Sequence, residues 1–67
     1  MVFGDALEQA KAGKRIARSS WIFDDAVYVK YTRDMSPYLV VQAKDREAIP
    51  YTATDIDLFA NDWEVVP

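Results

Sequence analysis

Apolar residues at helical spacing mark the first segment of the chain. Phe3 and Leu7 lie four residues apart, on one face of a helix, and a further alanine follows three positions later. Asp5 lies where a negative charge favours the positive end of a helix dipole. Gly13 follows the last apolar position, where glycine can adopt the left-handed conformation that closes a helix. The pattern predicts an amphipathic helix within residues 3–14 that packs on a sheet.

Alternation of apolar and polar residues then predicts strands. Ile16 points to one side of a strand while Arg15 and Ala17 point to the other. Pro50 cannot donate a hydrogen bond to a neighbouring strand, so its strand lies at an edge or ends there. The strands predicted in this way cover residues 14–18, 26–31, 38–43, 47–51 and 63–66, with the most hydrophobic run, 38–43, as a central strand.

A second helix is predicted shortly before the last strand. Thr52 and Thr54 are candidate N-caps, and Asp55 and Asp57 place negative charge in the first turn of a helix over residues 55–60. The chain therefore predicts an α+β fold. It has a short N-terminal helix, a small curled antiparallel sheet of about four to five strands, and a second short helix before the last strand.

The size of the chain predicts a single domain, residues 1–67, that is stabilised by association. A domain of about this length buries only about 60% of the surface of its unfolded chain. The sequence has no cysteine and no histidine, so it lacks disulfides and the usual zinc ligands. Because 51% of the residues are hydrophobic, we expect part of the apolar surface to meet another subunit in a homo-oligomer.

Charge narrows the possible partners. Eight basic and eleven acidic residues give a net charge of −3, which argues against binding of DNA or RNA because phosphate contacts need a basic face. No apolar run approaches the length of a membrane span, and the first residues do not resemble a signal peptide. We therefore expect a cytoplasmic protein with no membrane segment.

The acidic residues do not form a natural catalytic pair. Asp24 and Asp25 are adjacent, so their side chains diverge, and Asp55 and Asp57 lie two apart on a helix and do not face each other. A solvated loop and an acidic helix start account for both pairs. We expect no catalytic residues, no metal site and no cofactor, and an enzyme is an unfavoured interpretation because so short a chain offers no deep cleft.

A group of basic residues lies close to a tryptophan. Lys14 and Arg18 share a strand face and could bind one anion together, while Arg15 points to the other face. Trp21 could stack on a nucleotide base. A basic strand edge that discourages aggregation explains the charges nearly as well, and Trp21 and Trp63 are more often core or interface residues than ligand platforms.

Several segments resemble a family of very small phage and prophage proteins, formerly a domain of unknown function, that includes the Thoeris anti-defence sponge proteins. The resemblance runs nearly end to end. The segments that carry it are Phe3-Gly4-Asp5-Ala6-Leu7, Lys11-Ala12-Gly13-Lys14-Arg15-Ile16-Ala17-Arg18, Trp21, Pro37-Tyr38-Leu39-Val40-Val41 and Pro50-Tyr51-Thr52-Ala53-Thr54-Asp55-Ile56-Asp57-Leu58-Phe59-Ala60-Asn61-Asp62-Trp63-Glu64-Val65-Val66.

The resemblance implies a function without catalysis. Such proteins assemble as homo-oligomers, usually tetramers. They sequester a cyclic nucleotide immune signal, of the cyclic ADP-ribose type or a cyclic dinucleotide, in pockets between subunits. Carried over to this chain, Arg15 and Arg18 are the expected phosphate partners, Trp21 and Tyr51 the expected base platforms, and Asp55 a further ligand-binding position.

The chain departs from the family pattern at some of these positions. Tyr51 stands where the pattern has tryptophan and Asp55 where it has glutamine. The first tryptophan is followed by Ile22-Phe23-Asp24-Asp25, whereas the pattern has Asn-Gly after it. Added acids in a pocket would repel an anionic ligand. The alternative hypothesis is a small oligomeric module that binds a host or phage protein through Asp24, Asp25, Asp55 and Asp57, with no nucleotide ligand.

Overall fold

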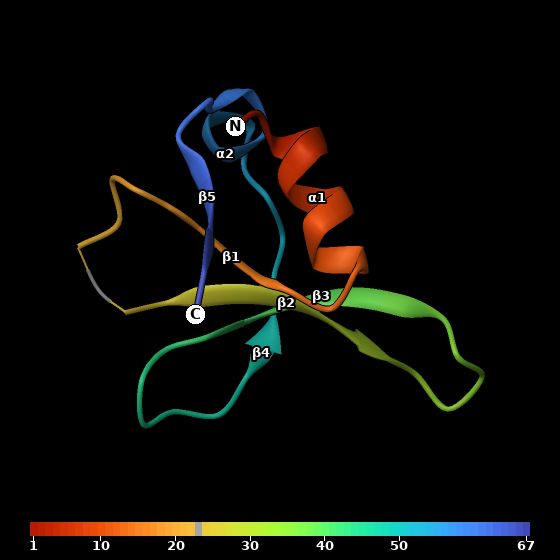
Figure 1. The fold of residues 1–67 in the computed structure, drawn as a ribbon. Helices are drawn as coiled ribbons and strands as arrows, with labels where there is room; N and C mark the ends of the chain where they lie inside the picture. Colours follow the sequence, from red (N-terminus) through yellow and green to blue (C-terminus); the bar gives the residue numbers. More distant parts are fainter. Residues whose placement is uncertain (23) are drawn as a thin grey trace.

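The computed structural model describes residues 1–22 and 24–67, and Phe23 lies outside the described residues. Five strands form one antiparallel sheet, and helix α1 (Phe3–Lys11) lies across one of its faces (Figure 1). The sheet order is β4-β3-β2-β1-β5. The strands are β1 (Arg15–Arg18), β2 (Ala26–Tyr31), β3 (Pro37–Gln42), β4 (Ile49–Pro50) and β5 (Trp63–Val66), and helix α2 (Asp55–Phe59) precedes β5. The predicted α+β fold is confirmed.

Gly13 closes α1 as predicted from the sequence. Its φ of 94° lies in the region that favours glycine. The Gly13 N–H donates to the carbonyl of Ala10 at 3.0 Å, and the Lys14 N–H donates to the carbonyl of Gln9 at 3.1 Å. These two bonds form a Schellman motif, which turns the chain directly into β1.

The core lies between α1 and one face of the sheet. Ala6 and Ala10 of α1 pack against Ile16, Val27 and Trp63, all of them buried. Ile16 pairs with Val27 across β1 and β2, so the apolar positions of the two strands share this face. Trp63 is 1% exposed, so it lies in the core, one of the two positions, core or interface, that were favoured for it over a ligand platform.

Both edges of the sheet are partly protected. Pro50 lies in edge strand β4, as predicted, although β4 has two residues where residues 47–51 were expected. At the other edge, the N–H of Trp63 donates to the carbonyl of Met1 at 3.1 Å, and the Met1 nitrogen donates to the carbonyl of Trp63 at 2.7 Å. The start of the chain thus continues the sheet beyond β5.

Strands β2 and β3 continue well beyond β1. Strand β1 pairs with β2 only at Ile16 and Val27, whereas β2 and β3 stay paired along residues 26–31 and 37–42. We call residues 29–39 the β2–β3 arm, which projects from the body of the molecule (Figure 1).

Neither of the two helices described in the structure has the length and apolar character of a membrane-spanning helix.

Candidate functional site

Arg18 lies at the centre of a polar network that joins distant parts of the chain. Its Nε donates to Oδ1 of Asp62 at 2.8 Å, and its Nη1 donates to Oδ1 of Asp57 at 3.1 Å. The hydroxyl of Tyr51 donates to the other oxygen of Asp57 at 2.6 Å. The Arg18 and Asp57 side chains are only 17% and 15% exposed, so the pair is well shielded from water.

Asp57 also fixes the orientation of α2. The hydroxyl of Thr54 caps the helix by accepting the Asp57 N–H at 3.3 Å, as the sequence predicts for an N-cap. The indole N–H of Trp63 donates to the Asp57 carbonyl at 2.8 Å. Asp57 is therefore held through its side chain and through its backbone, and α2 is attached to the body of the protein chiefly at this residue.

The network shifts the pKa of each of its members. The hydrogen bond from Arg18 holds the pKa of Asp62 far below its usual range. Burial raises the pKa of Asp57, but the hydrogen bonds from Tyr51 and Arg18 outweigh burial and lower it overall. Burial and the bond to Asp57 raise the pKa of Tyr51. At neutral pH the network thus contains two carboxylates, one guanidinium and a neutral phenol.

Arg15 lies on the opposite face of the sheet from this network. Its guanidinium carbon lies 5.9 Å from the centre of the Tyr28 ring, a cation–π distance. The Tyr28 hydroxyl in turn donates to Oε1 of Gln42 at 3.0 Å. Arg15 is exposed and forms no ion pair with the described residues. It is therefore a cation that remains available to a ligand.

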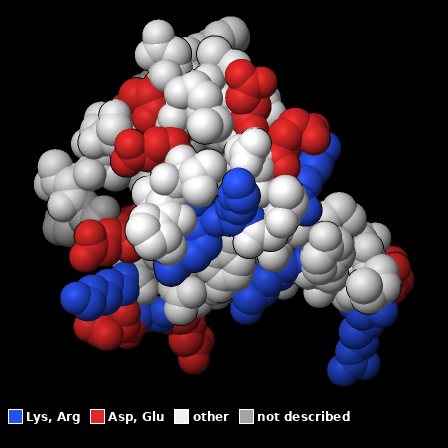
Figure 2. Space-filling view, in the orientation of Figure 1, with Lys and Arg blue, Asp and Glu red and all other residues white. Residues whose placement is uncertain are grey.

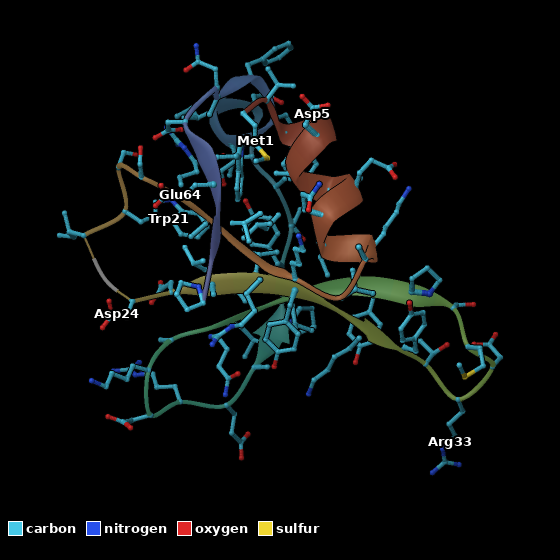
Figure 3. All side chains as sticks on the ribbon, viewed as in Figure 1. Met1, Asp5, Trp21, Asp24, Arg33 and Glu64 are labelled. Atoms are coloured by element: carbon cyan, nitrogen blue, oxygen red, sulfur yellow. The ribbon has the colours of Figure 1, made fainter. Side chains whose placement is uncertain are left out.

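A hollow of about 610 Å³ lies beside Arg15. Trp21, Asp24 and Glu64, which belong to its lining, lie on the same side of the molecule in Figure 3. A second hollow of about 550 Å³ shares four lining residues with it, namely Asp24, Asp25, Ala43 and Lys44. The volume of the first is in the range of ordinary ligand pockets, and its lining is largely built by β1, β5 and the loops that follow β1 and β3.

The charges around this hollow are mixed. Its basic side chains are Arg15, Arg18 and Lys44, and Arg18 already pairs with two carboxylates. Four acidic residues also line it, namely Asp24, Asp25, Asp45 and Glu64. A single subunit therefore presents no strongly positive surface here. An anionic ligand would need contacts close to Arg15 and Lys44, or additional cations from a second subunit.

The predicted ligand-binding residues fall into two groups. Arg15, Arg18 and Trp21 line the same hollow. Tyr51 packs against the core and belongs to the Arg18 network, and Asp55 is exposed at the start of α2. The structure thus places three of the five residues around the hollow. Tyr51 does not line it but is joined to Arg18 through Asp57, and Asp55 belongs to neither group.

Two details of the sequence interpretation change. Arg18 binds Asp57 and Asp62, so it does not present a free guanidinium beside Lys14. Trp21 is half-buried and meets Trp63 edge to face, with 5.5 Å between ring centres. Its ring therefore contributes to the core as well as to the wall of the hollow.

Sequence reasoning missed the contribution of Tyr28 and the role of Asp57. Tyr28 alternates with Val27 and Val29, a pattern that places its ring on the Arg15 side of the sheet. That signal was present, although the strand order that brings β1 beside β2 was not. The partners of Arg18 lie 39 and 44 residues away in the chain, and no local pattern identifies a pairing over that distance.

The described residues contain no cluster of three or more acidic, histidine or cysteine side chains suited to hold a metal ion.

No curated protein matches the chain. A model of the Tad2-like domain, described as the Thoeris anti-defense 2-like domain, matches residues 1–66. This match covers nearly the whole sequence, including the network, both helices and every residue that lines the hollow except Pro67. The chain therefore belongs to the Tad2-like family of Thoeris anti-defence domains.

Proposed function

We propose that this protein counters an immune response by sequestering a cyclic nucleotide signal, without catalysis, between subunits of a homo-oligomer. The ligand would be of the cyclic ADP-ribose type or a cyclic dinucleotide, and the expected assembly is a tetramer in the cytoplasm of the host cell. Family membership over residues 1–66 carries the proposal. It supports an anti-defence role directly, and the ligand is our inference.

The hollow beside Arg15 is the favoured position for the ligand. It combines an uncommitted guanidinium, an aromatic wall at Trp21 and a volume of about 610 Å³. An arginine suits phosphate because its planar donors can make two parallel hydrogen bonds. The mixed charge of the lining favours a site completed by a second subunit. In this arrangement Arg18 does not contact the ligand but holds the end of β1 and helix α2 in place. Tyr51 stabilises the Arg18 network through its hydrogen bond to Asp57.

Binding can be tested by isothermal titration against a panel of cyclic ADP-ribose isomers and cyclic dinucleotides. We expect Arg15→Ala to weaken binding of the active compound by about tenfold or more, the value of one charge-assisted hydrogen bond. Lys14→Ala is the matched control, because Lys14 is exposed, carries the same charge and does not line the hollow. Absence of binding across the panel by folded protein would refute the proposal.

Sequestration and catalysis are distinguished by the fate of the ligand. Bound nucleotide released by denaturation should have an unchanged mass after prolonged incubation with the protein. A shifted mass would show turnover and would contradict the non-catalytic part of the proposal.

A second candidate function is binding of a host or phage protein. The exposed apolar residues Ile56 and Phe59 on α2, beside the exposed acid Asp55, favour it. Co-purification from host lysate with wild type and with Asp55→Lys protein tests this function. A specific partner that is lost in the variant, together with no nucleotide binding, would favour this candidate over the first.

A further inference from the structure

Helix α2 has the reverse of the usual orientation of an amphipathic helix. Surface helices normally turn their apolar side chains towards the core. In α2, all of whose residues the structure describes, Asp57 faces the body, while Ile56 and Phe59 are 74% and 87% exposed. The hydrogen bonds of Asp57 hold the helix in this orientation. An apolar face held outward by a polar network is suited to contact another protein.

The start of the chain enlarges this apolar surface. The Met1 nitrogen donates to the carbonyl of Asn61, just beyond α2, at 3.2 Å, and the N-terminus lies beside α2 in Figure 1. We call the exposed apolar residues of this region the α2 patch; they are Met1, Val2, Ile56, Leu58 and Phe59. Two exposed acids accompany it, Asp55 on α2 and Asp5 in the first turn of α1 (Figure 3).

The β2–β3 arm has the complementary character. Its exposed large side chains are Tyr31, Met35 and Tyr38, residue types that are enriched in protein interfaces. Lys30 and Arg33 add two exposed cations, and Arg33 lies at the tip of the arm (Figure 3). The space-filling view shows a basic side chain projecting from this end of the molecule, with an acidic side chain beside it (Figure 2). The arm also carries one exposed acid, Asp34, whose carboxylate accepts a hydrogen bond from the Thr32 hydroxyl within the turn. The arm is thus apolar with a net charge of one positive unit, whereas the acids beside the α2 patch are both negative.

Charge decides which surface covers the α2 patch. Two copies of the patch facing each other would bring Asp5 and Asp55 of both chains together, and like charges at close range are unfavourable. An arm on the patch instead places Lys30 and Arg33 near these acids. In Figure 1 the arm projects away from α2 of its own chain, so the arm that reaches the patch belongs to another copy.

We propose that the β2–β3 arm of one subunit docks on the α2 patch of a second copy of this chain, and that a two-fold axis makes the contact reciprocal. In such a dimer each chain contributes one arm and one patch, giving two identical contacts. The proposed function also requires a homo-oligomer, but this contact is independent of the ligand and can be measured without one.

Sedimentation velocity of ligand-free protein tests the contact with two variants. The arm variant is Lys30→Glu with Arg33→Glu, and the patch variant is Ile56→Ser with Phe59→Ser. All four positions are exposed, so we expect the fold to survive, which circular dichroism checks. Each variant should raise the dissociation constant by about tenfold or more. Ile22→Ser, at an apolar residue that is also 87% exposed, should leave the dissociation constant unchanged.

Mixing the two variants gives the decisive result. A mixed dimer keeps one intact contact, between the arm of the patch variant and the patch of the arm variant. Equimolar mixing should therefore give more dimer than either variant alone at the same total protein concentration. A second route is to add Asp5→Lys and Asp55→Lys to the arm variant, which restores opposite charges and should restore association.

Four outcomes would overturn the proposal. They are a monomeric wild-type protein, variants that associate as the wild type does, a mixture that stays dissociated, and loss of association in the patch variant alone, which would indicate patch-to-patch contact. Ligand titration remains a separate measurement. An assembly that follows the expected pattern but binds no nucleotide would refute the proposed function only, whereas nucleotide binding by an oligomer insensitive to both variants would refute only this contact.

Discussion

Removal of the Asp57 side chain is the most informative test of the network around Arg18. In Asp57→Ala the Tyr51 hydroxyl loses its acceptor at 2.6 Å, and Arg18 loses one of its two carboxylate partners. Arg18 keeps Asp62 at 2.8 Å, so Tyr51 suffers the larger loss. The backbone carbonyl of residue 57, which accepts from the Trp63 indole, is retained.

The magnitude follows from these bonds. A hydrogen bond to a charged group contributes about 1.5–3 kcal/mol, and the half-buried position of Tyr51 lets water replace part of the loss. We expect Asp57→Ala to lower the free energy of unfolding by about 2–3 kcal/mol. A chain of 67 residues has a total stability of about 3–10 kcal/mol, so this single change removes a large fraction of it.

Urea unfolding followed by tryptophan fluorescence measures the effect, at one fixed protein concentration because association stabilises the folded state. Asp55→Ala is the matched control, since Asp55 lies on the same helix but is exposed. It should lose only the helix-dipole contribution, about 0.3–1 kcal/mol. Asp57→Asn, which keeps an acceptor oxygen but no charge, should fall between the two. Equal losses in the two alanine variants would refute the role assigned to Asp57.

Three further predictions concern stability. Asp57 and Asp62 have folded-state pKa values below the ordinary aspartate value of 3.8, so their stabilisation is complete above about pH 5 and declines as the pH falls through the ordinary value towards the folded one. Asp62→Asn should therefore flatten the acid limb of an unfolding titration, and an unchanged limb would contradict this. Gly13→Ala should destabilise the protein by about 1 kcal/mol because Gly13 has a positive φ. Gly4→Ala should stabilise it by about 0.5–1 kcal/mol, because Gly4 lies in α1 and a Cβ atom added there would meet no other atom within 4 Å. Thermal melts that rank the two variants in the opposite order would show that the argument for Gly13 as the helix-closing residue is wrong. Trp63→Ala should cost about 3–5 kcal/mol, enough to leave much of the chain unfolded by circular dichroism, and a fully folded variant would contradict its place at the centre of the core.

The helices and strands were largely readable from the sequence because their signals are local. The spacing of Phe3 and Leu7 and the position of Gly13 depend on hydrogen bonds that span only four to six residues. Alternation in β2 depends on the two-residue period of a strand. The prediction failed mainly in extent, at β4, where only Ile49 and Pro50 pair with β3.

The candidate site was only partly predictable. The sequence grouped Arg15, Arg18 and Trp21, and all three line one hollow. The sequence did not show that Arg15 is available to a ligand whereas Arg18 is already paired with carboxylates. That difference depends on which residues of other elements lie next to each face of β1. Arg15 faces Tyr28, and Arg18 faces Asp57 and Asp62.

The sequence by itself thus determined the elements, the apolar faces that form the core, and the family. The tertiary structure decided that β5 lies beside β1, and this pairing places Trp63 opposite Arg18. From that register follow the network, the orientation of α2 and the outward-facing α2 patch. The physical reason is one of range: helix and strand periods are fixed by neighbouring residues, whereas an ion pair between residues 39 or 44 positions apart exists only once the sheet has assembled.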